Sequence, residues 1–286
     1  MPGVDVDGVS LYYEEAGRGQ PVVFCHGIPT DYRAWQAQQG SFSQNYRTIT
    51  YSRRYALPNN RQGDLIDSTI ENNASDLEGL IEKLGLAPVH LVGHSYGGFI
   101  SAYMAADHPD LVRSLTLVEP AVSTVLVENP ESKTQMFSLL LRSPTVALSA
   151  RRFQSSSLYP SYKALDAGQM EKATELNVDG VQDKQGAYAL MPEQVKKMML
   201  DNARTIAELK TKFPAFKTQI RKITGKTLVV NGEASPLWLR KIGQLFAAMV
   251  PQGKTFTVPN TRHFPHLENP VEFNQHVLAF ISQDTI

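Results

Sequence analysis

Short apolar runs recur along most of this chain and end at glycine, proline or serine, as buried β-strands do. They cover residues 8–17, 21–27, 46–52, 89–93, 114–119, 226–231 and 254–259. The run "PVVFC" is apolar at successive positions, which is typical of a strand that is buried on both faces. We therefore expect strands in the interior of a covered sheet.

Between several of these runs, apolar residues recur at helical spacing. In residues 71–86, Leu77, Leu80, Ile81 and Leu84 would lie on one face, and Gly85 would end the helix. Further helices are expected over 95–109, 236–250 and 270–283. Strands that alternate with helices predict an α/β fold, a mostly parallel sheet flanked by helices on both faces.

Residues 121–224 interrupt this alternation. The segment is rich in methionine, has helical apolar spacing, and is far longer than an ordinary connection. We predict a helical cap over the carboxyl edge of the sheet, with 1–120 and 225–286 as the two parts of the core; additional core helix is the alternative.

Composition limits the classes of partner. The 286 residues contain 28 Lys+Arg and 28 Asp+Glu, and the pI is near 7.1. We therefore expect neither a nucleic-acid nor a membrane partner, and no window is apolar enough to span a bilayer. Cys25 is the only cysteine, and no secretory signal begins the chain, so a cytoplasmic location is expected. No metal-binding cluster is apparent, and neither a metal nor a cofactor is expected.

Gly93-His94-Ser95-Tyr96-Gly97 has the pattern G-x-S-x-G. The pattern follows a strand and opens a helix, which is the context of a nucleophile elbow; an ordinary glycine-rich turn is the alternative. Ser95 is the candidate nucleophile. The backbone N–H groups of Tyr96 and of Ile28, which follows His26-Gly27 at the end of another strand, are the candidate oxyanion donors.

Seven histidines are present, and "PNTRHFPHLENPVEF" contains two of them. His263 falls between the last strand and the last helix, at the sheet edge where Ser95 is expected. A general base must reach the serine hydroxyl, so His263 is favoured over His266. His26 and His94 are expected to be structural.

In the motifs "HGIPTDYRAW", "GHSYGG" and "RHFPHLENPVEF" the sequence resembles the α/β-hydrolase fold superfamily. The resemblance covers nearly the whole chain. It implies an eight-stranded sheet, a cap between strands six and seven, Ser95 as nucleophile and His263 as base. "HGIP" also resembles dehalogenases and epoxide hydrolases, but those have an aspartate where this chain has Ser95. Arg262 stands where the family usually has glycine before the base.

The resemblance places the usual acid of the triad after strand seven, where this chain has Ser235. Serine cannot provide the negative charge that orients the imidazole. Three carboxylates remain: Glu233, Glu268, and Glu119 at the end of strand six. Some superfamily members take their acid from strand six, and Glu119 directly abuts an apolar strand, so Glu119 is the preferred candidate.

Arg53, Arg54 and Tyr55 follow another strand at the carboxyl edge and could bind a substrate carboxylate or pair with acids on the surface. Trp238 could line a pocket or belong to the core. We expect a cofactor-independent serine hydrolase that cleaves a carboxylic ester or a related acyl bond of a small molecule. Carbon–carbon hydrolysis, lactone hydrolysis, haloperoxidase-like chemistry, or a ligand-binding receptor of the same fold are the alternatives. The sequence does not indicate an oligomeric state.

Overall fold

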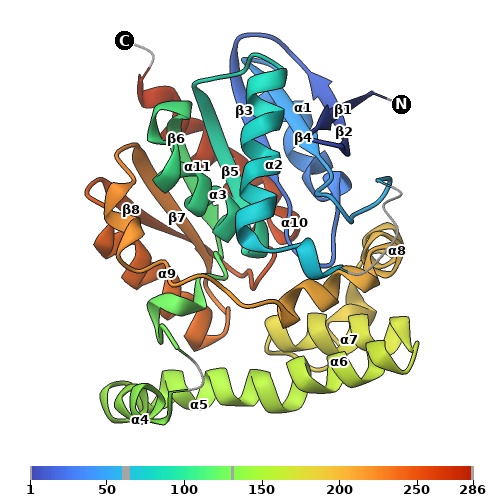
Figure 1. Cartoon of the computed structure of the whole chain (residues 1–286), viewed down its shortest axis with the longest axis vertical. Coiled ribbons are helices and arrows are strands. Elements are labelled where there is room, and N and C mark those ends of the chain that lie inside the picture. Colours follow the sequence, from blue (N-terminus) through green and yellow to red (C-terminus); the bar gives the residue numbers. More distant parts are fainter. Residues whose placement is uncertain (1, 60–64, 130–131, 285–286) are drawn as a thin grey trace.

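The computed structural model describes residues 2–59, 65–129 and 132–284. Its centre is one eight-stranded sheet with the order β1-β2-β4-β3-β5-β6-β7-β8 (Figure 1). The strands are β1 Gly3–Val6, β2 Val9–Ala16, β3 Gln20–Cys25, β4 Tyr46–Tyr51, β5 Val89–His94, β6 Val112–Val118, β7 Lys226–Gly232 and β8 Gly253–Val258. β2 is antiparallel to both of its neighbours, and the pairs from β4 to β8 are parallel. The predicted α/β architecture is confirmed.

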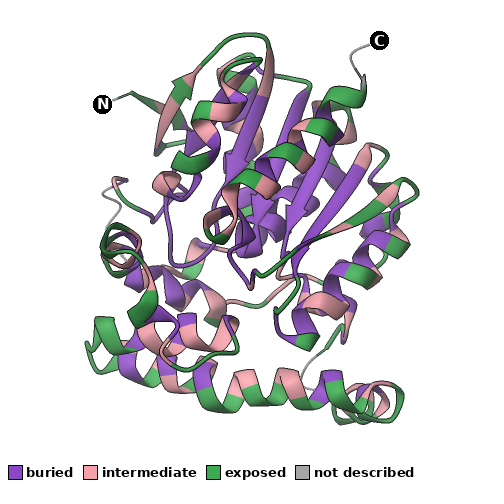
Figure 2. Cartoon of the chain, turned by 180° about the vertical axis from the view of Figure 1, so that it is seen from behind, coloured by how far each residue is buried: buried purple, intermediate pink, exposed green. Residues whose placement is uncertain are grey.

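Alternate residues of the central strands face two separate layers of helices. Val23 and Cys25 of β3 face one hydrophobic cluster, and Val22 and Phe24 face the other. The first cluster is covered by α2 Ile70–Lys83, α3 Ser95–Asp107 and α9 Leu237–Met249, and the second by α1 Gln36–Phe42 and α11 Pro270–Ile281. Both faces are buried, as Figure 2 shows for the interior of the sheet. This explains why these strands are apolar at successive positions.

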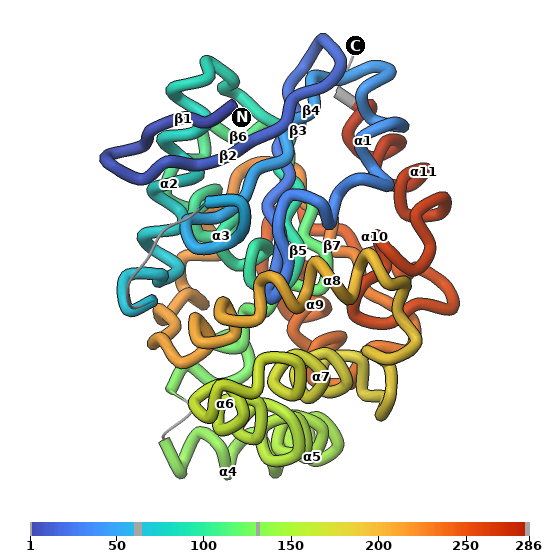
Figure 3. The backbone as a smooth tube through the Cα atoms, turned by 90° about the vertical axis from the view of Figure 1, so that its right-hand side faces the viewer, coloured from blue at the N-terminus to red at the C-terminus, as the bar shows by residue number. Residues whose placement is uncertain are grey.

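The chain between β6 and β7 is helical. It contains α4 Lys133–Arg142, α5 Pro144–Phe153, a π-helical turn Gln154–Leu158, α6 Tyr159–Asp166, α7 Met170–Val181 and α8 Glu193–Asp201. α4 to α7 lie together at one end of the molecule (Figures 1 and 3). Ala164, Ala173 and Ile206 of this segment join the same buried cluster as Leu115 of β6. The segment therefore packs onto the sheet, and its separation as a cap remains a prediction.

Shorter elements complete the described chain. One short helix, α10 Pro265–Glu268, follows β8, and the 3₁₀ turns are Tyr32–Trp35, Leu65–Asp67, Pro109–Leu111, Ser123–Val125, Tyr188–Leu190, Ala203–Lys210, Gln219–Lys222 and Ser282–Asp284. The sequence does not predict β1 as a separate strand, because its four residues include Gly3 and Asp5, both exposed, and only Val6 is buried. Within the described residues, no helix is long and apolar enough to cross a membrane.

Candidate active site

Ser95 is held in a strained turn between β5 and α3. Its φ is +52°, in the left-handed region that side chains other than glycine rarely adopt. A Cβ at Gly97 would lie 2.3 Å from the carbonyl oxygen of His26, and one at Gly93 would lie 2.6 Å from that of Gly97. Both glycines are therefore required by backbone contacts, as expected for a nucleophile elbow. The turn directs the hydroxyl of Ser95 to the carboxyl edge of the sheet.

His263 lies in the loop between β8 and α10, next to this turn. Its Nε2 is 3.1 Å from Oγ of Ser95, which is hydrogen-bond distance for a general base. The loop is held on two sides. The amide of His263 donates to Oε1 of Gln182 at 3.1 Å, and its carbonyl oxygen accepts from Nε2 of His94 at 2.8 Å.

Glu119 follows β6 and is also strained, with φ +48°. Its amide donates to the carbonyl of Val230 at 2.8 Å, which fixes the residue against β7. Its Oε2 lies 3.5 Å from Nδ1 of His263, and its Oε1 accepts a 2.7 Å hydrogen bond from the amide of Gly232. The structure thus brings Glu119, His263 and Ser95 into one chain of contacts, in the order of a catalytic triad.

Burial governs protonation in this chain of contacts. It raises the pKa of Glu119 to about 8, while the amide of Gly232 and the hydroxyl of Ser235 favour the charged form. The Ser235 hydroxyl has no hydrogen bond of normal geometry to a described residue. Its effect on the pKa of Glu119 is therefore weaker than that of the Gly232 amide. Burial lowers the pKa of His263 to about 4, so the imidazole is neutral at pH 7 and able to accept a proton.

The two other acid candidates make different contacts. Glu233 is exposed, and its Oε2 accepts from the amide of Asn260 at 2.9 Å. Glu268 accepts from the amides of Phe264 and Arg262 at 3.1 and 2.8 Å, so it stabilises the backbone around the base. Within the described chain, neither carboxylate forms a hydrogen bond or an ion pair with the imidazole of His263.

The Gly27–Ile28 peptide, whose N–H is the first candidate oxyanion donor, is held through its carbonyl oxygen. That oxygen accepts from the hydroxyl of Thr30 at 3.1 Å and from Nδ1 of His26 at 2.8 Å. A Cβ at Gly27 would lie 3.0 Å from Cβ of Ser95, so the peptide lies beside the nucleophile. Tyr96, the second candidate, lies in the first turn of α3, where N–H groups have no partner within the helix.

The structure places Arg53 and Arg54 in ion pairs within the chain. Nη1 of Arg53 is 2.5 Å from Oε2 of Glu208, and this pair is almost fully buried. Arg54 donates to both carboxylate oxygens of Asp76 at 2.8 and 2.9 Å. Each guanidinium already has a carboxylate partner within the chain. Ion pairing therefore accounts for Arg53 and Arg54 better than substrate binding does. The partners are buried rather than on the surface.

Two aromatic candidates are also largely buried. The hydroxyl of Tyr55 donates to Asp67. Trp238 stacks on Phe153 with ring centroids 5.0 Å apart, so it joins α9 to α5 of the helical segment. These contacts give both side chains a structural role. Substrate binding by Tyr55 and pocket lining by Trp238 stay predictions.

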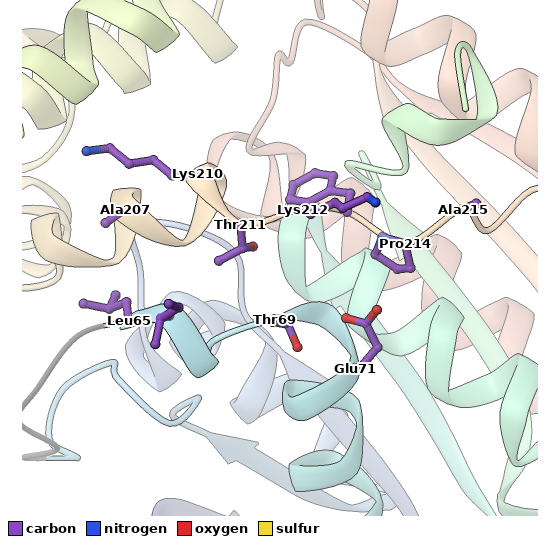
Figure 4. Close-up of a pocket in the computed structure, with 11 residues that line it drawn as sticks. Leu65, Thr69, Glu71, Ala207, Lys210, Thr211, Lys212, Pro214 and Ala215 are labelled. Carbon is purple, nitrogen blue, oxygen red and sulfur yellow. The ribbon is translucent and has the colours of Figure 1, made fainter. Parts of the chain in front are cut away.

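A cavity of about 770 Å³ lies between the start of α2 and the chain after Lys210 (Figure 4). Phe213 lines it and packs against Tyr96, with ring centroids 5.9 Å apart. The hydroxyl of Tyr96 donates to the carbonyl of Ser68, beside Thr69 at the cavity wall. The cavity therefore adjoins the residue that follows the nucleophile. Within the described ranges, no group of three metal-ligating side chains is present.

Two contacts of the site were missed by sequence reasoning. His94 was expected to be only structural, yet it holds the carbonyl of the base, and Gln182 holds its amide. The first contact joins residues 169 positions apart and the second joins residues 81 apart. The position of His94 in the elbow was the one local signal.

A strand–turn–helix elbow that directs serine at histidine, over a mostly parallel sheet, defines a class of enzymes built on one fold. Comparison with known families agrees, since the family model described as the alpha/beta hydrolase fold matches residues 20–270. The chain belongs to the α/β-hydrolase fold family, and its enzyme class is hydrolase.

Individual relatives are distant. The chain is 26% identical over 277 residues to 2-(acetamidomethylene)succinate hydrolase of Mesorhizobium japonicum, covering 93% of this chain and 90% of that one. It is 25% identical over 300 residues to epoxide hydrolase 3 of Xenopus tropicalis, covering 97% and 76%. A thermophilic esterase of Thermogutta terrifontis has a similar structure, with a TM-score of 0.67, 22% identity and coverage of 98% and 96%. At this identity the structural likeness concerns the fold.

Proposed function

We propose that this protein hydrolyses a carboxylic ester of a small molecule through an acyl-enzyme on Ser95, with a Ser95–His263–Glu119 triad. The observation that supports this most is the contact chain itself: 3.1 Å from serine to imidazole and 3.5 Å from imidazole to glutamate. A second support is that Ser95 and Glu119 both adopt strained backbone conformations, which persist where the surrounding structure enforces them.

In the first half of the reaction, Oγ of Ser95 attacks the carbonyl carbon of the ester while Nε2 of His263 takes the hydroxyl proton. The developing oxyanion receives hydrogen bonds from the amides of Ile28 and Tyr96, each contributing roughly 2.7–4 kcal/mol. The imidazolium then gives its proton to the departing alkoxide, and the alcohol leaves an acyl group on Ser95.

In the second half, His263 deprotonates a water, which attacks the acyl carbon and releases the acid and free Ser95. Glu119 accepts Nδ1–H throughout, which keeps Nε2 directed at Ser95 and stabilises the imidazolium.

The relatives frame the alternatives. The relative of Mesorhizobium japonicum is named as a hydrolase of an acetamidomethylene succinate. Hydrolysis of an amide-like or a carbon–carbon bond by the same triad is therefore an alternative reaction. Lactone hydrolysis and haloperoxidase-like chemistry would also use Ser95. Epoxide opening is disfavoured, because Ser95 stands where the resemblance expects the aspartate of that class.

The test is a chromogenic ester series of increasing acyl length, assayed beside a lactone and an acetamidomethylene succinate. We expect a burst of alcohol followed by steady turnover, acyl-enzyme mass on the peptide containing Ser95, and loss of both in Ser95→Ala. Stoichiometric release without turnover would instead indicate a receptor. Turnover that survives in Ser95→Ala would contradict the proposal.

A further inference from the structure

Residues 132–165 contain no aspartate or glutamate and five basic residues: Lys133, Arg142, Arg151, Arg152 and Lys163. The whole chain has equal numbers of acids and bases, and that balance hides this local excess. The segment comprises α4, α5, the π-helical turn and most of α6. A long stretch with only positive charges is attracted to anionic surfaces.

Large apolar side chains on α4 and α5 are exposed beside these bases. Phe137 and Leu141 of α4 are 60% and 69% exposed, and Leu148 of α5 is 59% exposed. Phe137 and Leu141 are one turn apart on α4, so they lie on one face of that helix. Leu148 is one turn from Arg151 and Arg152 on α5, so these three side chains also share a face. Each helix thus presents leucine or phenylalanine together with lysine or arginine.

These helices lie at the end of the molecule farthest from β1 and β2 (Figure 1), and among the described residues much of their outer surface is exposed (Figure 2). α4 and α5 are neighbours in the fold, and buried Val146 and Ala147 of α5 attach the pair to the rest of the chain. Exposed apolar side chains that gather beside basic residues are a feature of contact surfaces, whereas single exposed apolar residues are ordinary exterior.

We propose that the outer faces of α4 and α5 form a docking surface for an anionic lipid bilayer. Helices that lie in a membrane interface combine phenylalanine and leucine on one face with lysine and arginine that contact lipid phosphates. The charge sign and the exposed apolar side chains both match this occupant. The proposal replaces the expectation of no membrane partner, which rested on whole-chain charge.

A second copy of this chain is a poorer occupant. In a twofold dimer the same patch meets itself, so the basic residues of the two copies would face each other without acids. The nearest recorded acidic partner is Asp183, which lies 3.8 Å from Arg152, with both side chains well exposed. A nucleic acid would contact the lysine and arginine side chains but would leave Phe137, Leu141 and Leu148 in water.

The test is co-sedimentation of the full chain with vesicles of phosphatidylcholine mixed with phosphatidylglycerol, and with vesicles of phosphatidylcholine alone. We expect binding to the anionic vesicles, weakened by added salt. Arg142→Gln with Arg151→Gln should lower the partition coefficient by roughly fivefold for each charge removed. Leu141→Ser should lower it by roughly tenfold or more.

Matched controls lie elsewhere on the surface. Lys217→Gln with Arg221→Gln removes the same charge from exposed positions outside α4 and α5, and Val271→Ser removes an exposed apolar residue of α11. Both controls should bind vesicles like the unchanged protein. Binding is measured without any ester, so this result is independent of the proposed hydrolysis.

Three outcomes would overturn the proposal. Equal binding to neutral and anionic vesicles would remove the role of charge. An equal loss of binding in the control variants would remove the role of this surface. A dimer in light scattering that Leu141→Ser converts to a monomer would assign the patch to a second copy.

Discussion

The amide of Gly232 donates a 2.7 Å hydrogen bond to the carboxyl group of Glu119, so β7 supplies a donor to the acid that follows β6. The opposite carboxyl oxygen faces His263. One side chain therefore links two neighbouring strands to the candidate base.

Glu119→Gln should lower kcat about 10,000-fold, because the amide cannot stabilise an imidazolium and favours the wrong tautomer of His263. Far-UV circular dichroism should show an unchanged fold. The control is Glu233→Gln, which removes an exposed carboxylate near the same turn and should retain near-normal activity. Normal kcat in Glu119→Gln would exclude Glu119 as the triad acid. Loss of activity in Glu233→Gln would favour Glu233 as the acid instead.

The pH dependence of kcat/KM should show a limb set by Glu119. Burial raises its pKa to about 8, and the protonated carboxyl lacks the negative charge that stabilises the imidazolium of His263, so activity should fall as pH decreases through that value. Ser235→Ala removes a hydroxyl that favours the charged form, so the limb should move to higher pH. A limb at the same pH in both proteins would show that the Ser235 hydroxyl does not act on the carboxyl group of Glu119.

His94→Phe should reduce kcat by roughly 100-fold with a smaller change in KM, because the base loses the donor that fixes its carbonyl. Phenylalanine retains ring packing against Phe264 and His266, whose centroids lie 5.2 and 4.5 Å from that of His94. Steady-state kinetics and a thermal unfolding midpoint separate positioning from folding. A large fall in the midpoint with unchanged kcat would assign His94 a structural role alone.

Arg53→Met should reduce the free energy of unfolding by about 3–5 kcal/mol, because it leaves Glu208 as an unpaired buried carboxylate. Arg53→Met with Glu208→Leu should recover most of that loss, since Nε of Arg53 and Oε1 of Glu208 have no described partner even in the intact pair. Urea unfolding measures both. The control is Arg47→Met, which breaks a partly exposed pair with Glu15 and should cost under about 1 kcal/mol.

Gly97→Ala should unfold the elbow or prevent folding, because the new Cβ would lie 2.3 and 2.5 Å from two backbone oxygens that cannot move independently. Gly40→Ala is the matched control. It lies in α1 with no atom within 4 Å of the new Cβ, so alanine should stabilise the protein by about 0.5–1 kcal/mol. Thermal unfolding of both variants compares the same change of residue in two environments.

The sequence predicts the sheet well because burial on both faces leaves a local pattern. Val22 to Cys25 are apolar in succession and pack alternately into the two clusters. Glu119 could also be proposed locally, as a carboxylate at the end of an apolar strand. Its strained φ could not, because the backbone conformation depends on pairing with Val230 of another strand.

Other features depend on packing between distant segments. The spacing of Arg53 and Glu208 in the chain contains no signal that they meet, since 155 positions separate them. Helical periodicity likewise predicts an apolar face on α4 or α5 without showing whether another element covers it. The exposure of Phe137 and Leu141 is therefore a finding of the tertiary structure alone.

The bond between Gly232 and Glu119 also bears on how such enzymes diversify. Ser235 lies at the usual acid position, three residues after the glycine that now binds the strand-six carboxylate, and its hydroxyl influences the pKa of that carboxylate. The two acid positions therefore serve almost the same space beside His263. On the proposed triad, an aspartate at position 235 would stand close to the place that the carboxylate of Glu119 takes, so moving the acid between these strands would need two substitutions rather than a new fold.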